Sequence, residues 1–254
     1  MRLHFAAEGT GYPLIILHGL LGSCENWRAQ RKFFARSYRV FAVDLRNHGH
    51  SPHSEVFTFA AMAEDLKEFL EDQALESVHL LGHSLGGKVA MQFATSWPES
   101  VAKLVIVDIA PKSYPGEHLE ILAAMESLDL SALRSRAQAE AALAATVPAL
   151  SMRRFLLKNL EYRDQKLRWR INLPALRRNY PAILAALPLD RQFDKPALFV
   201  KGERSRSIEP KDEEQIRRFF PRAEIVTLAG AGHWVHSDNP EAFQQAVLSF
   251  LRRE

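Results

Sequence analysis

Six short segments of the chain are almost continuously apolar, and longer segments with apolar residues at helical spacing lie between them. Continuous apolar runs of this length are typical of strands in a parallel sheet that is covered on both faces. Strands are predicted at 14–19, 38–44, 77–82, 103–108, 197–202 and 223–229. Helices are predicted at 59–73, 85–97, 210–220 and 240–251. The alternation predicts an α/β fold, with a mostly parallel central sheet and helices on both faces.

One long interval, 111–194, interrupts this alternation. It contains no segment that predicts a strand, and the runs 131–145 and 151–160 have helical spacing. Prolines separate these runs, at Pro148, Pro174, Pro181 and Pro188. A helical cap inserted into the α/β frame is the simplest interpretation. We therefore predict a core formed by 1–110 and 195–254, and a cap formed by 111–194.

The composition excludes several classes of protein. The chain has 254 residues, of which 47% are hydrophobic and 25% charged, as in an ordinary globular protein. Cys24 is the single cysteine, so no intrachain disulfide and no cysteine-based metal cluster can form. No apolar run approaches the roughly 18 residues of a membrane span, and the first residues do not resemble a signal peptide. We expect a cytoplasmic protein without a membrane partner.

The segment LLGHSLGGK, residues 80–88, is the first candidate for chemistry. It places Ser84 between Gly82 and Gly86, where a predicted strand ends and a predicted helix begins. A sharp strand-to-helix turn exposes the serine oxygen, and glycines on either side avoid the clashes that such a turn creates. The following helix directs its amino terminus toward the same place and favours negative charge there. This context predicts a nucleophile rather than an incidental turn.

A serine nucleophile needs a general base. The segment LAGAGHWVHSDNP, residues 228–240, follows the last predicted strand and precedes the last helix. His233 in its glycine-rich part is the predicted base, and His236 is the rival, interpreted as a residue near the start of the helix. His18 at the end of the first strand is a third possibility, for which a bracing role beneath the site is favoured.

The base needs an acid that orients it. Asp108 ends the strand that follows the nucleophile strand, so a carboxylate there emerges at the same edge of the sheet and can orient an imidazole. Its alternative role is to cap the turn toward Pro111. Glu203 is a second candidate acid, and Ser205 is predicted to assist by a hydrogen bond to the histidine or to the acid.

A tetrahedral intermediate needs donors for its oxyanion. The segment HGLLG, residues 18–22, follows the first predicted strand. We predict that the backbone amide of Leu20 in this segment is one donor. The amide of Leu85, next after the nucleophile, is predicted to be the other.

Four motifs together resemble the α/β-hydrolase superfamily, and the resemblance covers the whole chain. They are HG at 18–19, DLRNHGHS at 44–51, GHSLGG at 82–87 and GAGHW at 230–234. With VDIAP at 107–111 and WRINLPAL at 169–176, the chain resembles the YbfF-like esterases, in which the acid and the cap follow the strand counted as the sixth.

The resemblance implies a triad of Ser84, Asp108 and His233, with Ser205 at the position where aspartate is usual. It implies hydrolysis of carboxylic esters, extending to acyl thioesters such as acyl-CoA, with no cofactor and no metal. The arginines on either side of Ser205, Arg204 and Arg206, depart from the family pattern.

The predicted cap is basic. Between 151 and 178 it has nine basic residues and two acidic ones. A solvated helix face accounts for such a bias, and the alternative is a basic rim that attracts anionic substrates. Arg163, Arg168 and Arg170 are the candidates for this rim, and Trp169 is a candidate for the acyl pocket unless it belongs to the core.

Several other functions compete with ester hydrolysis. Ser84 argues against enzymes of this fold that use an aspartate nucleophile, whereas hydrolases and lyases that cleave carbon–carbon bonds share the serine triad. A ligand-sensing receptor that retains the triad is a further alternative from another class. The net charge of +3 is too small to indicate a nucleic-acid partner. We therefore expect a small acyl ester or thioester as the partner, and the sequence carries no signature of an oligomeric state.

Overall fold

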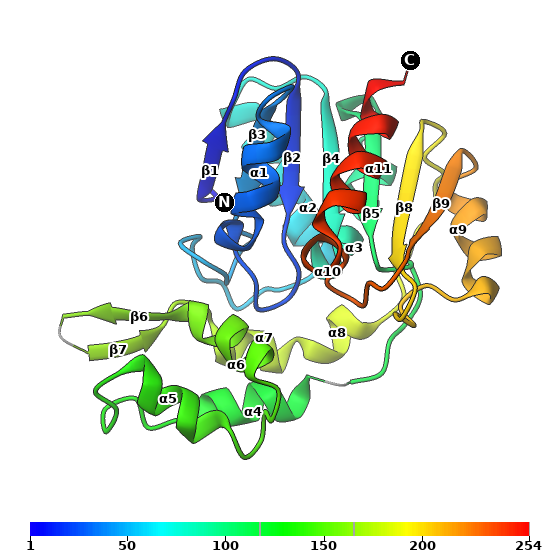
Figure 1. Ribbon diagram of the computed structural model, residues 1–254. Helices are drawn as coiled ribbons and strands as arrows, with labels where there is room; N and C mark the ends of the chain where they lie inside the picture. The colour runs from blue at the N-terminus through cyan, green and yellow to red at the C-terminus, as the bar shows by residue number, and fades with distance from the viewer. Residues whose placement is uncertain (117, 165, 254) are drawn as a thin grey trace.

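The computed structural model describes residues 1–116, 118–164 and 166–253, and its centre is a seven-stranded sheet (Figure 1). The sheet order is β1-β3-β2-β4-β5-β8-β9, and all pairs are parallel except β1 with β3. The strands are β1 (Phe5–Glu8), β2 (Pro13–Leu17), β3 (Arg39–Val43), β4 (Val78–His83), β5 (Val101–Val107), β8 (Ala197–Gly202) and β9 (Ala223–Leu228). The predicted α/β fold with a mostly parallel sheet is confirmed. The edge strand β1 was not predicted, because it has only four residues and none of them is fully buried.

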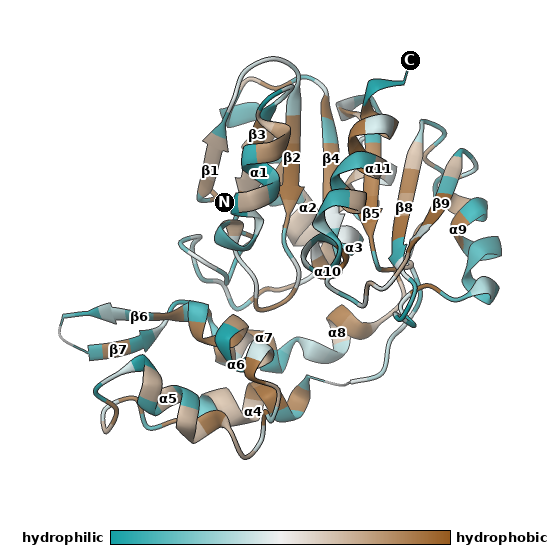
Figure 2. Ribbon diagram, viewed as in Figure 1, coloured by the Kyte–Doolittle hydropathy of each residue, from teal (hydrophilic) through white to brown (hydrophobic). Residues whose placement is uncertain are grey.

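Successive residues of the central strands enter two separate cores. Ile15 and Leu17 of β2 belong to one core, and Leu14 and Ile16 belong to the other. Helices α2 (Phe59–Asp72) and α3 (Leu85–Ser96) cover the first face. Helices α1 (Arg28–Phe34), α10 (Val235–Asp238) and α11 (Pro240–Arg252) cover the second. Figure 2 shows the resulting apolar strands between partly polar helices. Burial on both faces explains why the sequence of the strands is continuously apolar.

Polar residues precede the first turns of α2 and α11 and cap them. Thr58 accepts a hydrogen bond from the Ala61 amide at the start of α2, and Asn239 accepts one from Ala242 at the start of α11. The predicted helix at 210–220 is a 3₁₀ turn, η4 (Pro210–Asp212), followed by α9 (Glu213–Phe219).

The cap leaves the sheet after β5 and returns to it at β8. Its helices are α4 (Leu119–Ser127), α5 (Arg136–Leu143), α6 (Leu150–Leu156), α7 (Leu173–Arg178) and α8 (Tyr180–Leu184). A short 3₁₀ turn, η3 (Leu157–Asn159), follows α6. Figure 1 shows the cap lying across the edge of the sheet at which the parallel strands end.

The prediction that 111–194 contains no strand is wrong. A two-stranded antiparallel hairpin is formed by β6 (Leu160–Arg163) and β7 (Lys166–Trp169), and α6 ends before the predicted end of its helix. The strands are short, half of their residues are polar, and the turn contains no glycine. Asp164 supplies the left-handed backbone instead, with φ of 50°. For these reasons the hairpin could not be predicted from continuous apolar runs.

Side-chain hydrogen bonds attach the cap to the core. The Asn159 side-chain amide donates to the carbonyl of Leu21 at 2.7 Å, and Lys88 Nζ donates to the carbonyl of Ala185 at 2.6 Å. The cap is therefore held directly over the loop 18–22 and over α3. Among the residues that the structure describes, none of the helices has both the length and the apolarity that crossing a bilayer demands.

Candidate active site

Ser84 occupies a strained turn between β4 and α3. Its φ of 52° and ψ of −117° are unfavourable for a residue with a Cβ atom. A Cβ on Gly82 would lie 2.2 Å from the carbonyl oxygen of Gly86, and one on Gly86 would lie 2.5 Å from that of His18. Both glycines are thus required by close backbone contacts. The turn is pinned by the Ser84 amide, which donates to the carbonyl of Val107 at 3.0 Å.

The loop 18–22 lies directly against this serine. A Cβ on Gly19 would be 3.3 Å from the Cβ of Ser84. Leu85 is the first residue of α3, so its amide has no acceptor within the helix. The amide of Leu20 also has no backbone acceptor within the described part of the chain. Two unpaired amides next to one serine are suited to hold an oxyanion.

His18 uses both ring nitrogens within the protein. Its Nδ1 donates to the carbonyl of Gly19 at 2.8 Å, and its Nε2 accepts from the amide of Leu45 at 3.0 Å. Burial lowers the pKa of the ring, which is consistent with a neutral imidazole. This arrangement holds the loop in shape and leaves neither nitrogen for a substrate.

His233 and Asp108 lie within hydrogen-bonding distance of each other, at the edge of the sheet where β4 ends at the Ser84 turn. His233 Nδ1 donates to Asp108 Oδ2 at 2.7 Å, and the amide of Gly202 donates to Asp108 Oδ1 at 3.0 Å. The aspartate is fully buried. His83, adjacent to Ser84, donates from Nε2 to the carbonyl of His233 at 2.9 Å. The serine turn, the carboxylate and the histidine loop are therefore brought together.

Two serines extend this network. Ser205 Oγ donates to Asp108 Oδ2. Ser207 Oγ lies 3.1 Å from the oxygen of Ser205 and 3.2 Å from His233 Nδ1. Ser207 was not predicted; it approaches Ser205 because the chain bends here and the Ser207 amide donates to Ser205 Oγ at 3.2 Å. Arg204 and Arg206, the unexpected neighbours of Ser205, are exposed.

The other candidate acid is engaged elsewhere. Glu203 is exposed, and its Oε2 accepts from the amide of Gly230 at 2.8 Å. This contact closes the loop that carries His233, rather than orienting its ring. Of the two acids, only Asp108 contacts the imidazole among the described residues.

Removing the Ser205 hydroxyl should weaken turnover moderately. Ser205→Ala deletes one charge-assisted hydrogen bond to the carboxylate that orients His233. We expect kcat for p-nitrophenyl acetate to fall about tenfold with KM unchanged, since a hydrogen bond to a charged group is worth roughly 1.5–3 kcal/mol. Ser205→Thr, which keeps the hydroxyl, is the control. A kcat of Ser205→Ala equal to that of the wild type would show that Ser205 does not assist.

His236 is a packing residue in this structure. It is buried in α10, and its ring stacks on Trp27 with a centroid distance of 4.1 Å. Burial, and then the nearby His233, lower its pKa from 6.5 to about 3. Its carbonyl accepts a hydrogen bond from Gln30. The ring therefore lies beneath the histidine loop as a neutral group.

A buried neutral histidine makes stability depend on pH. When the pH falls from 7 to 5, His236 becomes protonated in the unfolded chain but not in the folded chain. Proton binding therefore stabilises the unfolded state relative to the folded state. Because the folded pKa of His236 is about 3, its contribution to the free energy of unfolding should fall by about 2 kcal/mol over this range. His236→Phe should remove that part of the fall, measured by urea unfolding at both pH values. The control is Phe243→Leu, a change at a neighbouring residue that does not titrate, which should leave the decrease in the free energy of unfolding between pH 7 and pH 5 unchanged. If His236→Phe showed the same decrease as the wild type, the prediction would be contradicted.

One cluster has residue types that bind metals, but its chemistry does not suit an ion. The cluster consists of His4, Cys24 and Asp44. The Asp44 carboxylate already accepts from the amide of Cys24 at 2.7 Å and from His4 Nδ1 at 2.8 Å. Burial, followed by the nearby carboxylate, raises the pKa of the thiol to about 12, whereas a metal ligand must be a thiolate. We assign no metal to it.

The predicted substrate residues of the cap lie apart from the predicted triad. Arg163, Arg168, Arg170 and Trp169 surround a hollow whose lining includes neither Ser84, Asp108 nor His233. The indole of Trp169 donates to the carbonyl of Met125, also in the cap, at 3.1 Å. Their role in substrate binding stays a prediction.

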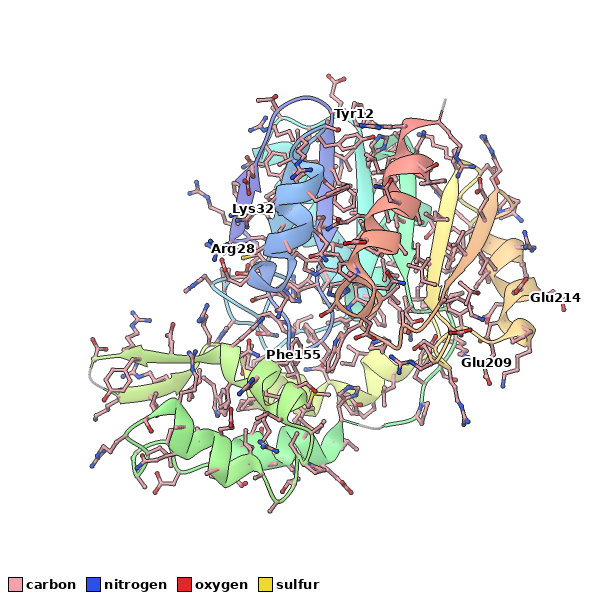
Figure 3. All side chains as sticks on the ribbon, in the orientation of Figure 1. Tyr12, Arg28, Lys32, Phe155, Glu209 and Glu214 are labelled. Carbon is pink, nitrogen blue, oxygen red and sulfur yellow. The ribbon has the colours of Figure 1, made fainter. Side chains whose placement is uncertain are left out.

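A different cap residue lies next to the histidine loop. The ring of Phe155 in α6 contacts that of Trp234, with a centroid distance of 5.4 Å, and Figure 3 shows it between the cap and the core. Phe155 is half-buried and adjoins the residue after His233. The ring of Phe155 therefore brings an apolar cap side chain to the histidine loop.

Comparisons with known proteins place the chain among hydrolases. Residues 12–240 match the family model described as alpha/beta hydrolase fold. The chain is 39% identical to the sn-1-specific diacylglycerol lipase ABHD11 of Mus musculus, over 96% of this chain and 82% of that protein. It is 34% identical to esterase YbfF of Escherichia coli strain K12, over 94% and 92% of the two chains. A solved structure of a marine microorganism esterase is 41% identical, with a TM-score of 0.96 and coverage of 98% of this chain and 99% of the other.

Proposed function

Because this chain belongs to the alpha/beta hydrolase fold family, we propose that it hydrolyses carboxylic esters through an acyl-enzyme on Ser84. The observation that carries the proposal is the contact between His233 and the buried Asp108, at 2.7 Å, beside a serine in a strained turn. Relatives named as esterase and lipase support ester hydrolysis, and the contact supports the serine mechanism.

The first half-reaction forms the acyl-enzyme. His233 Nε2 takes the hydroxyl proton as Ser84 Oγ attacks the ester carbonyl, and the amides of Leu20 and Leu85 hold the resulting oxyanion. Asp108 stabilises the imidazolium that forms, because its buried carboxylate accepts from Nδ1. The imidazolium then protonates the leaving alcohol, and the carbon–oxygen bond breaks.

The second half-reaction returns the enzyme. A water molecule loses a proton to His233 as its oxygen attacks the acyl carbon, and the same amides hold the second oxyanion. The proton returns to Ser84 Oγ as the acid leaves. These steps need no redox change and no further reactant.

The proposed substrate is a small-molecule acyl ester, and acyl thioesters are included because the same serine chemistry cleaves both. Phe155 is proposed to contact the acyl chain, because it lies beside Trp234 at the histidine loop. A cytoplasmic location is proposed on composition alone, since a chain with one cysteine has no intrachain disulfide that an oxidising compartment would need to maintain.

The acyl-enzyme can be observed directly. Mixing the protein with excess p-nitrophenyl acetate and quenching within milliseconds should give an acetyl group on the peptide that contains Ser84, detected by mass spectrometry. Release of nitrophenol should show a burst of one equivalent if deacylation is slow. Ser84→Ala is the control and should give neither product. Turnover without any serine adduct, retained in Ser84→Ala, would overturn the proposed mechanism.

A further inference from the structure

A basic hollow lies where the cap hairpin β6–β7 meets the loop that follows β3. Its volume is about 290 Å³. The core contributes loop residues and the cap contributes hairpin residues, namely Gly49, His50, Ser51, His53, Glu161, Arg163, Arg168, Trp169 and Arg170. Figure 1 shows that the hairpin projects from the end of the cap opposite to α8. The hollow is therefore a feature of the boundary between cap and core, separate from the serine turn.

Arg170 lies between the two walls of the hollow. Its Nη1 donates to His50 Nε2 at 3.2 Å, and its Nη2 donates to the carbonyl of Lys158 at 3.3 Å. Its Nε is buried and has no hydrogen-bond acceptor among the described residues, with the nearest carboxylate oxygen, on Glu161, at 3.6 Å. A guanidinium has five N–H donors, so Arg170 retains donors for an additional acceptor.

The hollow also carries excess positive charge. Arg163 makes no ion pair with any residue that the structure describes. Arg168 has Asp164 at 3.9 Å, but both side chains are more than half exposed, and such pairs bind weakly. Glu161 is the one acid among the residues that line the hollow. Three guanidinium groups therefore face one carboxylate.

We propose that this hollow binds a phosphate group. A phosphate offers acceptor oxygens on several sides, which suits guanidinium groups that approach from both strands of the hairpin, and arginine pairs with it in bidentate geometry. A single carboxylate would pair with only one of the three guanidinium groups. Trp169 adds an aromatic side chain to the lining, which suits a molecule that carries the phosphate on an apolar part. The phosphate comes either from a free anion or from a part of the substrate remote from the ester.

Binding of inorganic phosphate tests the site without turnover. Titration calorimetry at constant ionic strength should give one saturable site in the wild type and in Ser84→Ala. In the double variant Arg163→Gln/Arg168→Gln, the affinity should fall roughly tenfold, because two charge-assisted contacts are lost. The control is Arg154→Gln/Arg177→Gln, which removes the same charge from exposed cap positions outside the hollow and should bind like the wild type.

Two results would overturn the site: no saturable binding in the wild type, or an equal loss in both double variants, which would mean general attraction to a basic cap. Because this titration needs no catalysis, it stands or falls independently of the proposed ester hydrolysis.

The source of the phosphate is distinguished by kinetics. A matched pair of esters, one with a phosphate on the leaving group and one neutral, is compared in wild type and in Arg163→Gln/Arg168→Gln. If the substrate carries the phosphate, KM should rise about tenfold for the phosphorylated ester alone, and inorganic phosphate should compete with it. If a free anion is bound, KM should be unchanged for both esters and inorganic phosphate should not compete. Both outcomes support a phosphate site and differ only in what fills it.

Discussion

Asp108→Asn should lower kcat/KM for p-nitrophenyl acetate by about 10³–10⁴-fold and leave the protein folded, the effect expected when the triad acid becomes an amide. The side chain keeps its shape, so the packing around it should be retained. The measurement is the steady-state hydrolysis rate, with circular dichroism to show that the fold persists.

The reason for this loss lies in the donors that surround the carboxylate. Oδ1 of Asp108 accepts from the Gly202 amide, and Oδ2 accepts from Ser205 Oγ and His233 Nδ1. An asparagine replaces one of these acceptors with a donor. If its amide faces His233, the imidazole must turn to the tautomer with its proton on Nε2, which can no longer accept the proton of Ser84.

Glu203→Gln is the matched control, because it makes the same chemical change in the other acid near this edge. Glu203 contacts the amide of Gly230 and not the imidazole, so its variant should keep at least half of the activity. Loss of less than tenfold in Asp108→Asn would mean that another group orients His233. A larger loss in Glu203→Gln than in Asp108→Asn would transfer the role to Glu203.

The sheet was predictable from sequence because burial on both faces leaves an unmistakable apolar run. The six predicted segments correspond to β2, β3, β4, β5, β8 and β9. The chemistry at their ends follows from topology, since parallel strands finish at one edge and carry Ser84, Asp108 and His233 to it. Local sequence and sheet order agree here, and this agreement is why these positions could be predicted as one site.

Contacts between distant segments could not be predicted in this way. Nothing in the sequence indicates that the exposed hairpin β6–β7 sits beside the loop 49–53, since their proximity depends on how the cap is placed. Ser207 was missed for a related reason. Its closeness to His233 arises because the chain turns immediately after β8, where the Ser205 amide donates to the carbonyl of Gly202, and this turn brings Ser207 to the histidine loop. Pairings of this kind are set by tertiary packing rather than by periodicity.

A buried ion pair in the loop after β3 illustrates the same limit. Arg46 Nε donates to Asp65 Oδ2 at 2.5 Å and its Nη2 donates to Oδ1 at 2.8 Å, so the pair is bidentate. Both side chains are buried. The guanidinium also donates to the carbonyls of Val56 and Ala61. This single group therefore holds the loop 45–58 to helix α2.

The same loop supports both the oxyanion segment and the cap. His48 Nε2 accepts from the amide of Leu21 at 3.2 Å, and the carbonyl of Asn47 accepts from the amide of Asn172 in the cap at 3.0 Å. Greater mobility of the loop 45–58 would therefore disturb the amide donors near Ser84 and the contact between this loop and the cap. The ion pair with Asp65 therefore supports these contacts from a distance.

Asp65→Ala should lower the free energy of unfolding by about 3–5 kcal/mol, because it leaves the charge of Arg46 buried and unpaired. Urea unfolding monitored by tryptophan fluorescence measures the change. Glu64→Ala, the exposed neighbour on the same helix, is the control and should shift stability by about 0.5 kcal/mol or less. The double variant Arg46→Met/Asp65→Leu removes both charges and should recover more than half of the loss. A cost for Asp65→Ala no greater than that for Glu64→Ala would show that the pair does not anchor the loop, whereas a large cost that the double variant recovers would assign the loss to the unpaired guanidinium.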